Sequence, residues 1–278
     1  MTYRTLMAHL DVGEDNSALL AITGDLAERF ASAVIGIAAR RPVEVVAGVG
    51  SGAAAAELYN LDFQDMEEEF TSLQAEFRVA MAGKARELLW RSASVFGSLA
   101  SYVAGEARLA DVIITRPDRG LGILNRDRRT SVGDVIMTSG RPILVVPDGA
   151  GPLNLENVVV AWKDTREARR AVADAMPLLK AAERVWVIEV DTEHRLADAR
   201  GKLDDVVWWL AQHDVAAEAV PTPASGFDSG LLEEAARWRD AGLMVAGAYG
   251  HNRMREWVFG GVTSDLLLHP SRCTFISH

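Results

Sequence analysis

The chain has 278 residues, of which 49% are hydrophobic and 24% charged, a composition ordinary for a globular protein of one or two domains. Its formal net charge of −10 disfavours non-specific binding to nucleic acid or to an anionic membrane. No apolar run reaches the roughly 18 residues of a transmembrane helix, and the first residues lack the apolar core of a signal peptide, so we expect a cytoplasmic protein. A single cysteine, Cys273, excludes an intrachain disulfide framework and a cysteine-rich metal site.

Strands and helices are predicted to alternate through the first half of the chain. Apolar runs at 6–11, 33–38, 110–115 and 142–146 indicate buried strands. A helical pattern follows the first strand, and a longer one runs from about 61 to 89. The long pattern carries an apolar stripe that either packs on the sheet or serves as a lid or partner-binding surface, formed by Phe63, Met66, Phe70, Leu73 and Phe77.

A glycine-rich segment at 48–53 precedes the long helical pattern and imitates the Gly-x-Gly-x-x-Ala loop of dinucleotide-binding domains. The acidic residues 67–69 stand at about the distance of the acid that binds the ribose in such domains. They fall inside the helical pattern and not at the end of a strand, where that mechanism requires them. We therefore interpret 48–53 as a loop before the helix.

The second half repeats the same order of elements. Strands are predicted at 158–162, 185–190, 243–246 and 273–276, with a helix after the first of them. A further helical pattern, which we expect to pack on the sheet, contains Trp208 and Trp209 with Val206, Val207 and Leu210. Residues 130–146 align one for one with 260–276, which indicates two copies of one domain at 1–148 and 155–278, joined by a linker rich in proline and glycine.

The most informative segment follows the strand at 243–246. Gly247, Gly250 and Gly260 are spaced as Gly-x2-Gly-x9-Gly, and an apolar helical pattern begins after Gly261. Glycines let backbone N–H groups approach an anion closely, and the N-terminus of a helix adds partial positive charge. The segment therefore predicts a phosphate-binding loop that differs from the P-loop and from the dinucleotide fingerprint.

This glycine loop resembles the nucleotide loop of the universal stress proteins, as do Val-Ala-Trp-Lys-Asp-Thr at 160–165 and Arg-Pro-Ile-Leu-Val-Val at 141–146. The resemblance covers both halves and implies a tandem protein of two fused domains with a role in stress response. It implies an α/β fold with an open parallel five-stranded sheet in each half, in the order 3-2-1-4-5, with helices on both faces, as in adenine-nucleotide alpha hydrolases. It also implies that ATP with Mg²⁺, or AMP, binds at the ends of strands 1 and 4, where the strand order reverses.

The resemblance places the phosphate contacts of the second half on Gly247, Gly250, Gly260, Gly261, Val262 and Thr263. The backbone N–H groups of 260–262 and the hydroxyl of Thr263 would donate to the phosphate. Gly261 replaces the usual serine or threonine, so we expect weaker or altered phosphate binding. His251 lies within the loop, where it either touches phosphate or is exposed.

The nucleoside end of this site departs further from the family pattern. Lys163 stands where the family usually carries an aspartate, and a lysine cannot accept hydrogen bonds from the nucleoside. Either the neighbouring Asp164 substitutes for the aspartate or the contact is missing. Lys163 itself either pairs with phosphate or another anion, or is a solvated loop lysine. Val190, at the end of the second strand of this half, matches a position that packs against the base, or it belongs to the core.

The first half shows the reverse pattern. Asp11 stands where the family carries its aspartate, whereas Arg116 and Arg119 replace the first two glycines of the loop. These arginines either fill the space that a triphosphate needs or bind a different anion. Hydroxyls at the start of the following helix are kept by Thr130 and Ser131. We expect that the first half does not bind ATP in the usual way.

Three functions are compatible with these motifs. The favoured one is a regulatory protein that binds an adenine nucleotide or a related small anion in its second half. One alternative is a nucleotide-independent stress protein that acts through protein partners or another small ligand. The other is a slow ATP hydrolase, although no catalytic residue or general base is evident and the scattered histidines form no metal-ligand pattern. The last strand of each half is an edge through which family members dimerise, so we expect an intramolecular pseudo-dimer, a monomer or a homodimer.

Overall fold

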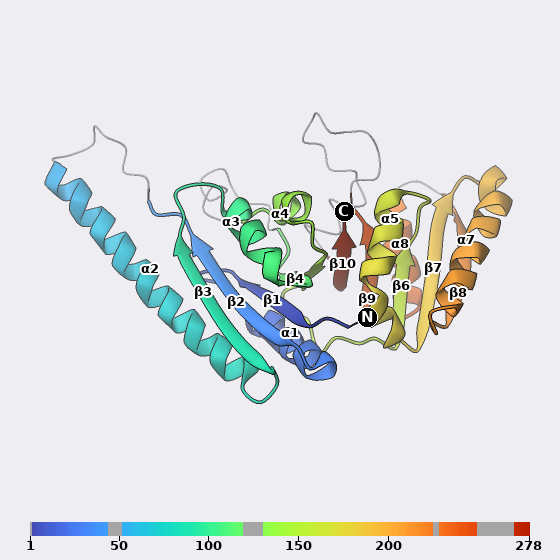
Figure 1. Cartoon of the computed structure of the whole chain (residues 1–278). Coiled ribbons are helices and arrows are strands. Elements are labelled where there is room, and N and C mark those ends of the chain that lie inside the picture. The colour runs from blue at the N-terminus through green and yellow to red at the C-terminus, as the bar shows by residue number, and fades with distance from the viewer. Residues whose placement is uncertain (1, 44–51, 119–129, 225–227, 249–269) are drawn as a thin grey trace.

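The computed structural model describes residues 2–43, 52–118, 130–224, 228–248 and 270–278 (Figure 1). The strands of these ranges form one ten-stranded sheet. In the first half the strands are β1 (Thr5–Leu10), β2 (Ala33–Arg40), β3 (Glu87–Ser94), β4 (Val112–Thr115) and β5 (Ile143–Val145). In the second half they are β6 (Asn157–Ala161), β7 (Arg184–Asp191), β8 (Ala217–Pro223), β9 (Leu243–Gly247) and β10 (Cys273–Ser277). The helices are α1 (Ser17–Phe30), α2 (Gly52–Met81), α3 (Leu99–Glu106), α4 (Val132–Ser139), α5 (Arg166–Asp174), α6 (Met176–Lys180), α7 (Leu196–Ala211) and α8 (Asp228–Trp238).

The strand order brings strand 1 of each half beside strand 4. Across the sheet the order is β3-β2-β1-β4-β5-β10-β9-β6-β7-β8, so each half runs 3-2-1-4-5 from its outer edge. Neighbours within a half pair in parallel. The mostly parallel α/β fold is thus confirmed.

Pairing of β5 with β10 joins the five-stranded sheets expected for the two halves into one continuous sheet. These two strands pair antiparallel, with Leu144 opposite Phe275. Each half alone would leave the N–H and C=O groups of its last strand unpaired along one edge. In the antiparallel pairing, these groups of β5 and β10 hydrogen-bond to one another.

Helices cover both faces of this sheet. Successive strand residues point to opposite faces, so Leu6, Ala8 and Leu10 of β1 belong to one buried cluster and Met7 to the other. Buried side chains of α1, α2, α5, α6 and α7 complete the first cluster, and those of α3, α4 and α8 complete the second. A two-sided helical cover of this kind suits a parallel sheet, whose strands are apolar on both faces.

The apolar stripe of the long helix packs on the sheet. Its members Met66, Phe70, Leu73 and Phe77 are buried, and Phe63 is partly buried against them. The expected helix at 61–89 is wrong at both ends, because α2 begins at Gly52 and ends at Met81. Gly83, at φ +75°, lies in the turn after the helix, and the chain then enters β3. Among the described helices, none is both long and apolar enough to cross a membrane.

The helix α7 packs on the sheet as expected, but Trp208 and Trp209 lie outside its buried stripe. The buried stripe of this helix consists of Ala199, Leu203 and Leu210, whereas Trp208 is 65% and Trp209 37% exposed. Each residue turns a helix by about 100°, so the residues directly before Leu210 point away from the stripe that it shares with Leu203.

Replacing Phe275 by alanine tests how much the packing at the junction of β5 and β10 contributes to the stability of the protein. Phe275 is fully buried in β10 and stacks on Tyr3 at a centroid distance of 6.4 Å. We expect Phe275→Ala to lower the free energy of unfolding by about 3–5 kcal/mol in urea titration, as buried phenylalanines do. Phe96→Ala is the matched control, because Phe96 is exposed, and it should change stability by less than about 0.5 kcal/mol. Equal losses in the two variants would contradict this role.

Candidate functional site

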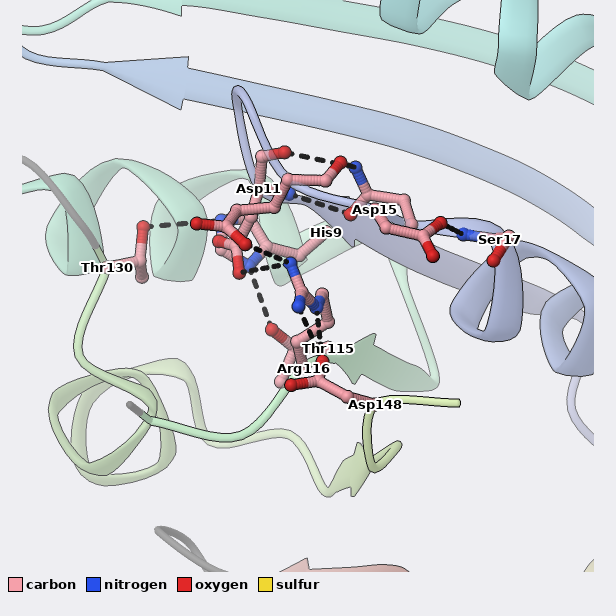
Figure 2. Close-up of polar contacts among 10 residues, drawn as sticks. His9, Asp11, Asp15, Ser17, Thr115, Arg116, Thr130 and Asp148 are labelled. Carbon is pink, nitrogen blue, oxygen red and sulfur yellow. Dashed lines mark hydrogen bonds and ion pairs between the residues drawn. The ribbon is translucent and has the colours of Figure 1, made fainter. Parts of the chain in front are cut away.

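The first candidate site is the polar cluster where β1 and β4 end side by side. Ala8 of β1 pairs with Ile114 of β4, so the residues after these positions share one end of the sheet. This is the point at which the strand order reverses, and open α/β sheets bind their ligands at such a point. Figure 2 shows that side chains from both strand ends, from the start of α4 and from the segment after β5 converge here.

His9 links three elements at the centre of this cluster. Its imidazole is buried, with Nδ1 2.9 Å from the Thr115 hydroxyl and Nε2 3.2 Å from the Thr130 hydroxyl (Figure 2). Burial lowers the pKa of His9, against an opposing effect of the Asp11 carboxylate. The ring is therefore neutral at neutral pH and ties β1 to β4 and to the approach of α4. Nothing in the sequence singles out His9, which stands within an apolar strand.

Arg116 is enclosed by carboxylates of its own chain. Its side chain is only 5% exposed, and Nε donates to Asp148 Oδ1 at 3.0 Å while Nη1 donates to Glu14 Oε2 at 3.3 Å. The same Nη1 lies 3.9 Å from Asp11 Oδ2. Burial lowers the pKa of Arg116, but the hydrogen bonds and ion pairs with these carboxylates outweigh burial and raise it. Arg116, expected either to fill the space of a triphosphate or to bind another anion, thus pairs with Asp11 of its own chain. Arg119 lies outside the described residues.

The loop that carries Asp11 is fastened by Asn16. The buried side-chain amide of Asn16 accepts from the Asp11 backbone N–H at 3.0 Å and donates to the carbonyls of Asp11 and Glu14, each at 3.0 Å. Asp15 Oδ1 accepts from the Ser17 backbone N–H at 2.9 Å. These bonds fix the path from β1 into α1 and hold Asp11 and Glu14 against Arg116.

Asp118 places a carboxylate at the N-terminus of α4. Its Oδ1 accepts from the backbone N–H of Val132 at 2.8 Å, and its Oδ2 lies 3.4 Å from that of Gly133. The unpaired N–H groups at a helix start favour such an anion. In the repeat alignment these two residues match Val262 and Thr263, at which the phosphate contacts of the second half are predicted. An acidic side chain of the protein thus lies at the helix start that aligns with the predicted phosphate contacts of the second half.

The two hydroxyls at the start of α4 are also engaged within the chain. Ser131 caps the helix, since its hydroxyl accepts from the backbone N–H of Asp134 at 3.2 Å. The hydroxyl of Thr130 contacts His9. Every predicted first-half site residue that the structure describes therefore has a partner inside the chain.

The second candidate site lies where β6 and β9 end. Ala161 of β6 pairs with Ala246 of β9, which brings Lys163 and Gly247 to the same end of the sheet. The side chain of Lys163 is exposed. Asp164 Oδ1 accepts from Arg169 Nη2 at 2.5 Å, so this carboxylate already has a cationic partner. Val190 packs partly buried against the second apolar cluster.

Gly247 touches the backbone of the neighbouring helix. A Cβ at this position would lie 2.5 Å from the backbone nitrogen of Ala168 and 2.6 Å from the carbonyl carbon of Glu167, in the first turn of α5. A side chain here would force β9 and α5 apart. The glycine at 247 is thus required for packing, whatever it contributes to a ligand. The other loop residues predicted to bind phosphate lie outside the described residues: Gly250, His251, Gly260, Gly261, Val262 and Thr263.

The described residues form neither a metal-binding cluster nor a reactive thiol site. Within them, no group of three or more His, Cys, Asp and Glu side chains could hold a metal ion. Cys273 is buried in β10, and burial raises the pKa of its thiol to about 12. It therefore stays protonated and unreactive at neutral pH.

Comparisons with known proteins give a likeness in structure. No protein-family model matches the chain, and no curated protein matches its sequence. The structure of a universal stress protein from Archaeoglobus fulgidus superposes with a TM-score of 0.77 at 13% identity, covering 98% of this chain and 95% of that one. A protein of unknown function from Pseudomonas aeruginosa PAO1 gives a TM-score of 0.59 at 14% identity, covering 99% and 92%. The chain therefore has the fold of a solved universal stress protein along nearly its whole length.

The environment of Asp118 makes a prediction for the pH dependence of stability. Burial raises the pKa of Asp118 to about 6, against the lowering effect of the N–H groups of Val132 and Gly133. A carboxyl whose pKa is raised by folding stabilises the protein fully below its unfolded pKa near 4, and this contribution is lost as pH rises through about 6. We expect the difference in unfolding free energy between wild type and Asp118→Asn to fall by roughly 2 kcal/mol from pH 4 to pH 7. Parallel stability curves for the two proteins would rule out the buried carboxylate.

Proposed function

We propose that this chain is a universal-stress-type regulatory protein of two fused domains, 1–148 and 155–278. Its C-terminal domain binds an adenine nucleotide, ATP or AMP, or a related small anion. The fold likeness to the Archaeoglobus fulgidus protein and the Gly-x2-Gly-x9-Gly loop support the family. The crevice between the ends of β6 and β9 is the predicted binding position.

The observation that carries this proposal is the carboxylate of Asp118 at the N-terminus of α4. In the first repeat, the anion position of the fold is filled by the chain itself. The strand at 110–115 matches that at 241–246, and continuing this alignment sets Gly247 opposite Arg116 and Tyr249 opposite Asp118. At these two aligned positions the second repeat therefore carries neither a carboxylate nor an arginine, and its glycine loop is proposed to take an anion from solution.

The charged side chains near the ends of β6 and β9 favour a ligand that is held mainly through its phosphate and less through its nucleoside. Lys163 is an exposed cation at the end of β6, beside the end of β9. Asp164 is paired with Arg169, so a nucleoside hydroxyl would have to compete with a guanidinium for its oxygens. The proposed ligand is consequently held through its phosphates, with Lys163 as a cationic partner.

Isothermal titration with MgATP and with AMP tests this function. We expect saturable binding by the wild type and at least a tenfold loss of affinity in Gly250→Val/Gly260→Val, because valine side chains would obstruct the N–H cradle. Gly151→Val is the matched control, since a Cβ at Gly151 has no neighbour within 4 Å, and it should bind as the wild type does. Absence of saturable heat with both nucleotides, or unchanged affinity in the double variant, would refute nucleotide binding at this loop.

We also propose that the chain is a monomer in solution, cytoplasmic in location. Pairing of β5 with β10 uses inside one chain the strand edge through which universal stress proteins dimerise. Light scattering coupled to gel filtration should give the mass of one chain at micromolar concentration. A mass of two chains would show that another surface associates.

A further inference from the structure

A cavity of about 420 Å³ lies between α5 and α7, beside the end of β6. Its apolar wall consists of Trp162, Val172, Val206 and Trp209. Its polar wall consists of Asp164, Arg169, Lys202 and Asp205. The volume falls within the range of small-molecule sites, and the mixed lining is typical of them.

The helix α7 presents a separate stripe to this cavity. Lys202, Asp205, Val206 and Trp209 follow the spacing i, i+3, i+4, i+7, which places them on one side of the helix. The stripe that packs on the sheet, through Leu203 and Leu210, lies beside it. The exposure of Trp209 is thereby explained, because its indole belongs to the cavity wall and not to the core.

The cations of the cavity are already neutralised. Arg169 pairs with Asp164 at 2.5 Å, and Lys202 Nζ pairs with Asp198 Oδ2 at 3.0 Å. Among the residues that the structure describes, Asp205 has no hydrogen bond or ion pair. The cavity thus has a carboxylate to offer and no unpaired cation, which favours a positively charged ligand over an anion.

Two buried polar atoms near the cavity lack partners. Trp162 is 8% exposed and lines the cavity, and its indole N–H has no acceptor within the described ranges. Glu189 of β7 is 6% exposed, and its Oε2 is likewise without a partner there. By strand alternation Glu189 faces the same side as Val185 and Val187, which is the side of α5 and α7. Its charge interacts with those of Lys202 and Asp164 in the cavity wall.

We propose that this cavity binds a small organic cation with an apolar body, whose ammonium group pairs with Asp205 and whose body contacts Trp162 and Trp209. Indoles are the strongest partners of such cations among the aromatic side chains. The chain's net charge of −10 adds a general attraction for cations. The cavity shares only Asp164 with the residues proposed for nucleotide binding, so the two sites can be tested apart.

Titration calorimetry with phenethylammonium, and with phenethyl alcohol as its neutral counterpart, tests the proposal. The cation should bind the wild type at least tenfold more tightly than the alcohol, and 3-phenylpropionate should bind more weakly than either. Asp205→Asn should reduce the affinity for the cation about tenfold and leave that for the alcohol unchanged. Trp209→Ala should weaken both ligands.

Trp238→Ala is the matched control, because Trp238 is 81% exposed and lies outside the cavity lining. It should bind both ligands as the wild type does, and so should Gly250→Val/Gly260→Val, whatever that variant does to ATP. Equal affinities for cation and alcohol, no effect of Asp205→Asn, or no saturable heat with phenethylammonium would each overturn the proposal.

Discussion

The antiparallel pairing of β5 with β10 is the interaction on which the rest of the structure depends. It places Leu144 opposite Phe275 and turns two five-stranded units into one sheet. The contact extends beyond the strands, because the ring of Tyr3 stacks on Phe275 and its hydroxyl donates to the backbone carbonyl of Asp174 in α5 at 2.7 Å. Burial, followed by the charges of Asp174 and Asp111, raises the pKa of Tyr3 well above its ordinary value, so this phenol stays a donor. The N-terminal segment thus helps to hold the second half in place.

Within this shared frame the two halves have diverged at equivalent places. In the first half, the Asp118 carboxylate lies at the N-terminus of α4 and the Arg116 side chain lies among carboxylates of its own chain. In the second half, Gly247 keeps the close contact between β9 and α5. In the first half, the polar side chains at the ends of β1 and β4 bond to other groups of the chain. The second half has the glycine spacing for which a ligand is proposed. Equivalent places in the strand order therefore have a structural use in one half and a proposed binding use in the other.

The central strands were predictable from sequence, and the outer ones were not. Strands such as β1, β4, β6 and β9 have neighbours on both sides and read as continuous apolar runs. The two strands that the sequence did not reveal, β3 and β8, are the outer edges of the sheet, and nearly all of their residues are exposed or only partly buried. The helical pattern at 61–89 ran past Met81 because Leu88 and Leu89 of β3 extended its apolar spacing.

The sites divide in a similar way. Asp11 could be singled out from the family resemblance, and Arg116 and Thr130 from their alignment with the glycine loop of the second half. His9, Asn16 and Asp148 could not be singled out, since their roles arise only where β1, β4 and the segment after β5 meet in space.

The cavity between α5 and α7 could not be predicted from the sequence for another reason. Trp209 reads as a core residue in sequence, and only the angular position on the helix separates it from Leu210.

The cluster around Arg116 has a consequence for any substitution at this position. The guanidinium follows β4 and pairs with Asp11 and Glu14 of the segment between β1 and α1, and with Asp148 of the segment after β5. Replacing Arg116 by glycine would remove all three of these ion pairs at once. One side chain thus fastens three segments that are far apart in the sequence, and its loss would loosen all of them together.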